Sequence, residues 1–299
     1  MTTSEGQSGS GGVVIVGGGQ AGLAVSWYLG RQGIEHLVVE AETPVHAWSD
    51  TRWDNFTLVT PNWHCRLPGY PYAGSDPDGF MKRDEVVEWL NGWLDTFAPP
   101  LRTNTRVTRL RQAHSGGFEL TLLSEAGSET MTCDDVAVAT GGYPVPVVPP
   151  YAPSLDPAVV QLHSEQYRNP EQLPGGAVLV VGTGQSGAQI AEDLHLAGRR
   201  VHLAMGKAPR VARFYRGRDC MTWLADMGVY DIGVQEYPGG QAAREKTNHY
   251  VTGRDGGRDI DLREFASQGM NLYGLLENGK DARLEFAPTL RASPASRAA

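Results

Sequence analysis

The sequence lacks a cysteine framework. Its 299 residues include three cysteines, Cys65, Cys133 and Cys220, and no two of them stand at C-x-x-C spacing. An odd number of cysteines without a paired spacing argues against structural disulfides, a zinc site and a redox-active dithiol. The sequence therefore predicts a cytoplasmic protein of a reducing compartment, with no bound metal.

Long apolar runs and blocks of positive charge are also missing. No run approaches the ~18 residues of a membrane-spanning helix. Residues 1–12 are polar and have no basic start of a signal peptide, and we expect them to be disordered. With a net charge of −8 and no basic block, a nucleic-acid partner is not expected. The remaining composition, with 40% hydrophobic residues, is that of a soluble globular protein.

Glycine is abundant, with 37 residues, and one glycine-rich turn follows the first apolar segment. The segment Val13–Val16 predicts a buried strand, and a helix and a second strand at 37–40 follow the turn. The turn is a G-x-G-x-x-G motif, Gly17-Gly18-Gly19-Gln20-Ala21-Gly22. Its glycines allow a tight turn, close approach to a pyrophosphate, and close packing of helix on strand. Glu40 ends the second strand, where an acid accepts hydrogen bonds from ribose hydroxyls.

The same plan recurs in the second half of the chain. Ala177–Val181 predicts a strand, 188–196 a helix and 201–204 a second strand. The turn between the first strand and the helix is Gly182-Thr183-Gly184-Gln185-Ser186-Gly187. No acid ends the second strand here, and basic residues follow instead: Lys207, Arg210, Arg213, Arg216 and Arg218. Arginine favours a 2′-phosphate, so this loop predicts NADPH, unless these arginines form a solvated loop face.

Two loops in one chain predict an α/β fold with two Rossmann-like dinucleotide-binding domains. We expect a first domain over 13–150, a proline-rich linker over 151–176, a second domain over 177–287, and an irregular tail over 288–299. Within the first domain the sequence predicts a helix over 83–97 and strands over 107–110, 118–122 and 136–139. One dinucleotide cannot occupy both loops, and the usual pairing is a flavin with a nicotinamide that reduces it.

The order of the motifs resembles the class B flavoprotein monooxygenases, which include flavin-containing, Baeyer–Villiger and indole-3-pyruvate monooxygenases. The residues that carry the resemblance are the first loop, the strand end Ala139-Thr140-Gly141, and the second loop with its G-x-G-x-S-G pattern. The resemblance implies that FAD binds at the first loop and NADPH at the second. It also implies that the reduced flavin captures O2 as a C4a-(hydro)peroxide and oxygenates a small-molecule substrate. Such flavin chemistry is consistent with the lack of an evident Ser-His-Asp set, H-E-x-x-H motif or carboxylate pair.

The resemblance also implies further contacts with the flavin cofactor. Trp48, Arg52 and Trp53 lie in the loop where relatives contact the flavin, although the tryptophans are equally compatible with plain packing. The loop Thr60-Pro61-Asn62 is expected near the isoalloxazine, and Val107 at the adenine. We therefore expect cofactor contacts from Gly17, Gly19, Gln20, Ala21, Gly22, Glu40, Trp48, Arg52, Val107, Thr140, Gly141, Gly182, Gly184, Gln185, Ser186, Gly187, Lys207, Arg210 and Arg213.

The chain departs from the family pattern at two places. Of the fingerprint F-x-G-x-x-x-H-x-x-x-(Y/F/W), only His163 and Tyr167 match, because Pro157 and Val159 stand at the F and G positions. His163 is therefore equally compatible with a structural and a direct role. No second A-T-G strand follows the second domain, so the chain looks shortened. A non-catalytic dinucleotide-binding remnant and an electron-transfer reductase stay open as alternatives, as does a homodimer.

Overall fold

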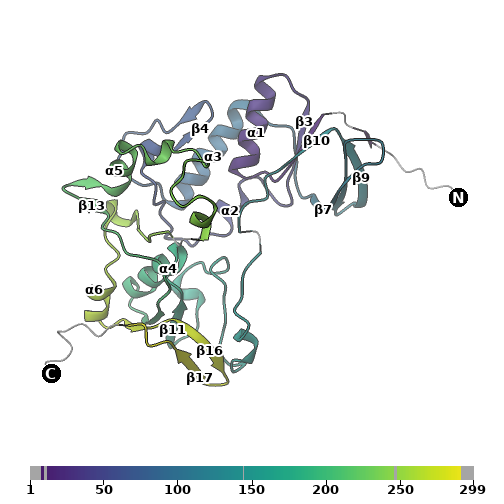
Figure 1. Cartoon of the computed structure of the whole chain (residues 1–299). Helices are drawn as coiled ribbons and strands as arrows, with labels where there is room; N and C mark the ends of the chain where they lie inside the picture. Colours follow the sequence, from purple (N-terminus) through teal and green to yellow (C-terminus); the bar gives the residue numbers. More distant parts are fainter. Residues whose placement is uncertain (1–7, 10–11, 144, 246–247, 291–299) are drawn as a thin grey trace, which may run out of the picture. The chain divides into compact units, whose positions relative to one another are not determined.

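The structure is a computed structural model that describes residues 8–9, 12–143, 145–245 and 248–290. Its packing divides the chain into two units, shown in Figure 1. The first unit comprises residues 1–51, 63–75 and 84–146, and the second comprises 52–62, 76–83 and 147–299. The expected continuous domains therefore differ from the packing, because two early segments, 52–62 and 76–83, pack with the second unit.

The first unit is built on a parallel sheet with the strand order β10-β2-β3-β6. Its central strand reads VVIV, and Val14 and Ile15 are fully buried, as a sheet covered on both faces requires. The helix α1 (Gln20–Arg31) connects β2 to β3 and packs against both strands. The strands are β2 (Val13–Val16), β3 (His36–Val39), β6 (Leu101–Arg102) and β10 (Asp135–Val138).

A second sheet of the first unit has the order β1-β9-β8-β7. The predicted strands at 107–110 and 118–122 are confirmed, but the strand between residues 127 and 133 was not predicted because most of its side chains are polar and exposed. The strands are β1 (Ser8–Gly9), β7 (Arg106–Gln112), β8 (Phe118–Ser124) and β9 (Gly127–Cys133). The pairing of β1 with β9 corrects the expectation of disorder for Ser8 and Gly9, while residues 1–7 and 10–11 lie outside the described residues.

The remaining elements of the first unit are one long helix and several short segments. The predicted helix over 83–97 is confirmed as α3 (Arg83–Phe97), with Val86, Leu90 and Leu94 buried at helical spacing. Trp93 is fully buried on the same helix and donates its indole N–H to the carbonyl oxygen of Pro68, 3.0 Å away. The short elements are α2 (His46–Ser49), η1 (Asn62–His64), β4 (Arg66–Leu67) and β5 (Tyr70–Pro71).

The second unit repeats the plan with the parallel sheet β11-β12-β15. The predicted strands and helix are confirmed as β11 (Ala177–Val181), α4 (Gln185–Leu196) and β12 (Arg200–Ala204). Residues 205–261 lie between β12 and α6 (Leu262–Ser267), which leads into β15 (Asn271–Tyr273). This insertion follows the carboxyl end of β12, the edge at which α/β sheets bind ligands.

Short elements complete the second unit. Its helices and strands include β13 (Phe214–Tyr215), β14 (Arg218–Asp219), α5 (Cys220–Asp226), β16 (Leu276–Lys280) and β17 (Arg283–Phe286). Its short 3-10 helices include η2 (Ala152–Ser154), η3 (Pro170–Gln172), η4 (Val229–Asp231), η5 (Gly240–Glu245) and η6 (Arg254–Gly256). None of the helices in the described part of the chain is long and apolar enough to cross a membrane. The expected irregular tail is described only to residue 290.

Candidate dinucleotide-binding sites

The first glycine loop has the close packing that its motif predicts. Gly17 has a φ of 111°, which disfavours any side chain, and a Cβ there would lie 2.5 Å from the carbonyl oxygen of Ala139. A Cβ on Gly22 would overlap the carbonyl oxygen of Gly17, so helix and strand approach closely only without a side chain. Gly19 is different, because a Cβ on it would meet no protein atom within 4 Å. The open space over Gly19 fits the approach of a pyrophosphate to the backbone.

Glu40 lies beside the first loop. Its Oε2 accepts from the amide of Gly18 at 2.5 Å, and its Oε1 accepts from the amide of Glu42 at 2.9 Å. The carboxylate is thus held at the carboxyl end of β3 by two backbone donors, with lone pairs left for ribose hydroxyls. The helix α1 begins at Gly19 without a side-chain cap, so Gln20 and Ala21 lie at an open helix N-terminus that suits a phosphate.

Other predicted contacts of the first unit lie near this loop. Val45 donates its amide to the carbonyl oxygen of Gly18 at 3.2 Å, which brings α2 with Trp48 next to the loop. Thr105 donates its amide to the carbonyl oxygen of Glu40 at 2.9 Å, two residues before Val107. The side chain of Val107 packs against the apolar core. The strand end Thr140-Gly141 is exposed and follows β10, the neighbour of β2.

The second glycine loop repeats these features except at its first glycine, where a Cβ on Gly182 would meet no protein atom within 4 Å. Gly182 has a φ of 97°, and a Cβ on Gly187 would overlap the carbonyl oxygen of Gly182. A Cβ on Gly184 would meet no protein atom within 4 Å, and Ser186 is exposed in the first turn of α4. The helix again begins without a side-chain cap, which leaves its first amides for an anion. The side chain of Gln185, by contrast, is held by the backbone of Val251.

The two loops are fastened to the next strand in opposite ways. In the first unit the amide of Gly18 donates to the strand-end acid Glu40. In the second unit the hydroxyl of Thr183, which is fully buried, accepts from the amide of Gly206 at 3.0 Å. Sequence reasoning missed Thr183, although a hydroxyl at the second position of a glycine loop, with no acid to receive an amide, is the signal that could have identified it.

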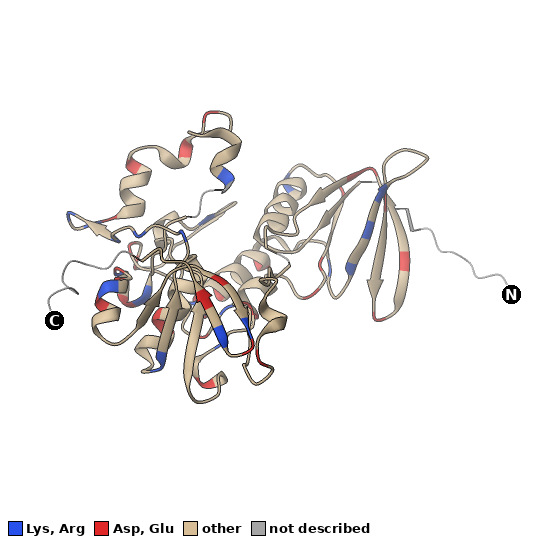
Figure 2. Ribbon diagram, turned by 60° about the horizontal axis from the view of Figure 1, so that its bottom comes forward, with Lys and Arg blue, Asp and Glu red and all other residues tan. Residues whose placement is uncertain are grey.

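The basic residues after β12 are largely engaged with carboxylates. Arg210 pairs with Asp259 and Asp261 at 2.9 and 3.0 Å, and Arg218 pairs with Asp226 at 2.7 Å. Arg213 is fully buried, with its Nε 2.5 Å from Asp219 and its guanidinium stacked 4.2 Å from the centre of the Phe80 ring. Over the described part of the chain, acidic and basic residues are interspersed (Figure 2). Arg210 and Arg218 are thus exposed but neutralised by carboxylates, and Arg213 is buried, so the role of these arginines at a 2′-phosphate stays a prediction.

Lys207 and Arg216 are the exposed cations of this group that no carboxylate of the described residues pairs with. Lys207 directly follows Gly206, which is tied to the loop through Thr183. Arg216 lies at the tip of the β13–β14 hairpin over Tyr215, away from the end of β12 in the sequence. Lys207 is therefore the residue of the predicted set that is both adjacent to the loop and available to an anion.

The candidates for flavin proximity, Thr60, Asn62 and His163, all belong to the second unit. The amide group of Asn62 is buried, donating to the carbonyl oxygen of Asp76 at 2.9 Å and accepting from the amide of Met81 at 3.0 Å. His163 Nδ1 accepts from the amide of Glu165 at 3.4 Å. Both side chains therefore have structural partners, and Thr60 is half-buried. Their role near the flavin stays a prediction.

Arg52 and Trp53 pack within the second unit. Trp53 is buried against Phe56 and Tyr167, with ring centres 5.1 and 6.4 Å apart. This position supports plain packing as its role. Arg52 lies over the Phe56 ring, and burial lowers the pKa of its guanidinium while the charge of Glu165 raises it.

Comparisons with known proteins agree with this geometry. Residues 14–224 match the family described as pyridine nucleotide-disulphide oxidoreductase. An uncharacterized CzcO-like oxidoreductase of Geobacillus kaustophilus is 34% identical, over 74% of this chain and 62% of its own length. The probable indole-3-pyruvate monooxygenase YUCCA3 of Arabidopsis thaliana is 28% identical, over 73% of this chain and 54% of its own length.

Solved structures show the same fold. The flavin-containing monooxygenase of Stenotrophomonas maltophilia has a TM-score of 0.66 and 23% sequence identity, with 92% of this chain and 73% of that chain covered. The chain spans between 31% and 62% of the length of the curated relatives compared with it. Two Rossmann-like units, two dinucleotide loops and a family match over most of its residues establish that this chain belongs to the pyridine nucleotide-disulphide oxidoreductase family.

Proposed function

We propose that this chain carries the two cofactor sites of an NADPH-dependent, FAD-containing monooxygenase that acts on a small molecule with O2. FAD occupies the first loop and NADPH the second. When bound, the nicotinamide supplies hydride and the flavin passes the electrons to O2. The observation that carries the proposal is the pair of open positions over Gly19 and Gly184, each in a loop whose last glycine, Gly22 or Gly187, leaves no room for a side chain.

The surroundings of the two loops support the assignment of the cofactors. Glu40 is held beside the first loop, where a carboxylate accepts ribose hydroxyls and repels a 2′-phosphate. The second loop has Met205-Gly206-Lys207 at the corresponding strand end, with no acid. A solved neighbour, OTEMO, was crystallised as a complex with FAD and NADP, with 23% identity and a TM-score of 0.53.

Disulfide reduction is less well supported than oxygenation, despite the family name. None of the three cysteines forms a disulfide in the described part of the chain, and the thiols of Cys65 and Cys133 are buried. Burial also raises the pKa of the Cys65 thiol to about 11, which keeps it protonated and a poor nucleophile at neutral pH. The monooxygenases among the relatives therefore point to the better-supported reaction.

Two alanine variants test the assignment of the loops. Gly19 and Gly184 have extended backbone angles, φ −79° and −62°, that alanine also adopts, so each variant should fold with a loss of about 1 kcal/mol at most. Each new Cβ occupies the space into which a pyrophosphate would come. Gly19→Ala should weaken FAD binding by at least about tenfold and spare NADP+, and Gly184→Ala the reverse.

The readouts are flavin absorbance after gel filtration and calorimetric titration with NADP+. Loss of FAD from Gly184→Ala, with NADP+ binding intact, would overturn the assignment. NADPH oxidation coupled to O2 uptake and to an oxygenated product tests the reaction itself. Binding of both cofactors without turnover would favour a non-catalytic dinucleotide-binding role.

A further inference from the structure

The helix α4 is buried on two faces of opposite character. Toward the sheet it presents Ala188, Ala191 and Leu194, all fully buried. Its other face is a polar stripe, defined here as Gln185, Gln189, Glu192 and Asp193, at the spacing i, i+4, i+7 and i+8 of one helix face. Glu192 and Asp193 are 2% and 1% exposed. Charged residues are rarely buried to this extent without partners, so the stripe needs an explanation.

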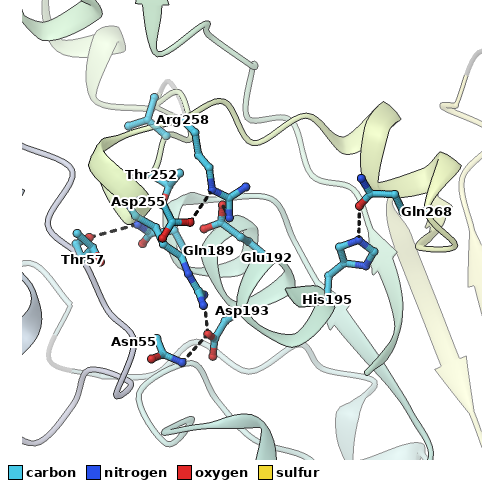
Figure 3. A network of polar contacts seen from close by, with 12 residues as sticks. Asn55, Thr57, Gln189, Glu192, Asp193, His195, Thr252, Asp255, Arg258 and Gln268 are labelled. Carbon is cyan, nitrogen blue, oxygen red and sulfur yellow. Dashed lines mark hydrogen bonds and ion pairs between the residues drawn. The ribbon is translucent and has the colours of Figure 1, made fainter. Parts of the chain in front are cut away.

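Asp193 accepts hydrogen bonds from three distant parts of the second unit. Figure 3 shows its contact with Asn55. Its Oδ1 accepts from Asn55 Nδ2 at 3.0 Å and from Arg254 Nη1 at 2.8 Å. Its Oδ2 accepts from the hydroxyl of Tyr167 at 2.7 Å. One carboxylate thereby joins residues that lie 138, 61 and 26 positions away in the chain.

The other members of the polar stripe hold a strap, defined as residues 250–258. Gln185 binds the backbone of Val251 twice, through donation to its carbonyl oxygen and acceptance from its amide. Glu192 lies 2.9 Å from Arg258 Nη2. Burial raises the pKa of Glu192, and the charge of Arg258 and a hydrogen bond from Thr252 oppose that shift. The strap is therefore fixed along the helix at both of its ends.

The strap also contacts an outer segment, defined as residues 52–62. A Cβ on Gly253 would overlap the carbonyl oxygen of Leu58, so the two backbones touch there. Gln189 of the stripe donates to the carbonyl oxygen of Thr57 at 3.4 Å. Asn55 reaches Asp193 from the same segment. The outer segment and the strap are thus tied to each other and to α4.

We propose that Asp193 is a positioning residue that keeps the outer segment and the strap in register with the second glycine loop, which begins the same helix. The proposal rests on the proposed function, because the outer segment contains Thr60 and Asn62, the expected neighbours of the flavin. Misplacement of reacting groups by about 1 Å costs up to about a hundredfold in rate. The polar stripe would thereby act on hydride transfer without touching either cofactor.

Asp193→Asn tests this role, because it keeps the shape of the side chain and removes the charge that faces Arg254. We expect flavin reduction by NADPH to slow by about tenfold to a hundredfold. The dissociation constant for NADP+ should change less than threefold, since the loop itself is untouched. The matched control is Asp231→Asn, the same substitution on an exposed carboxylate of the second unit outside the strap and the outer segment, which should leave both values unchanged. Asn55→Ala provides a milder variant that removes one donor from an exposed residue.

Hydrogen–deuterium exchange provides a readout that does not depend on turnover. Asp193→Asn should raise exchange about tenfold in both 52–62 and 250–258, relative to Asp231→Asn. Unchanged exchange would overturn the inference, and so would faster exchange with an unchanged rate of flavin reduction. A wild-type protein that binds no NADP+ would refute the proposed function, and exchange alone would then decide whether Asp193 ties the two segments to α4.

Discussion

Lys207 is predicted to be the main contact of the NADPH 2′-phosphate. It is exposed, it directly follows the residue fastened to the loop by Thr183, and no described carboxylate neutralises it. A hydrogen bond between charged groups contributes about 1.5–3 kcal/mol, so Lys207→Ala should raise the dissociation constant for NADPH by about 10- to 150-fold. Binding of NADH, which has no 2′-phosphate, should be unaffected. The assay is fluorescence titration with each nucleotide.

Two further variants decide whether the reasoning is right. Arg210 can reach a phosphate only by giving up Asp259 and Asp261, so Arg210→Ala should weaken NADPH binding by about threefold, an effect that salt screens. Lys280→Ala removes the same charge from the β16–β17 hairpin and should have no effect. A larger loss of NADPH binding from Arg210→Ala than from Lys207→Ala would refute the assignment. Arg213→Ala is less informative, because that side chain is fully buried and its loss would disturb folding.

Two other predictions concern stability. Gly187→Ala should lower the free energy of unfolding by about 1–3 kcal/mol, because the new Cβ would overlap the carbonyl oxygen of Gly182. Urea unfolding of this variant and of Gly184→Ala measures the difference. Equal stability of the two variants would contradict the close packing at Gly187. Cys65 has a pKa raised by burial to about 11, so its contribution to stability is present below the usual value of 9.0 and is lost as the pH rises through 11. Relative to Cys65→Ala, the free energy of unfolding of the wild type should fall by about 1–3 kcal/mol between pH 9 and 11, and parallel curves for the two proteins would count against this.

The parts of the fold that the sequence predicts are those with a local cause. The strand Ala177–Val181 and the helix Arg83–Phe97 are confirmed at their predicted bounds, since a continuous apolar run and a helical spacing are local patterns. The strand Gly127–Cys133 has no such pattern and is formed by pairing with β8. The grouping of residues 52–62 with the second unit is likewise invisible in the sequence, because it depends on contacts such as Asn55 with Asp193.

The arginines after β12 show that contacts between residues far apart in the sequence also escape prediction at the candidate site. Their spacing predicts a basic surface, but the acids that neutralise Arg210 lie about 50 positions further along the chain, at Asp259 and Asp261. Sequence distance hides such pairs, whereas Lys207 is kept next to its loop by a backbone hydrogen bond from its neighbour Gly206. A prediction from residue type alone therefore favours the arginines as contacts of the 2′-phosphate. A prediction that includes their carboxylate partners favours Lys207.

The opposite direction of one hydrogen bond explains how two copies of the same plan can differ in their cofactors. Each loop must be fastened to the end of the next strand, and in the first unit the carboxylate of Glu40 does so by accepting from Gly18. That carboxylate places negative charge where a 2′-phosphate would lie. In the second unit Thr183 accepts from Gly206 instead, so the fastening needs no acid. The strand end is then free to carry Lys207, and the charge at that position can favour a phosphate without loosening the loop.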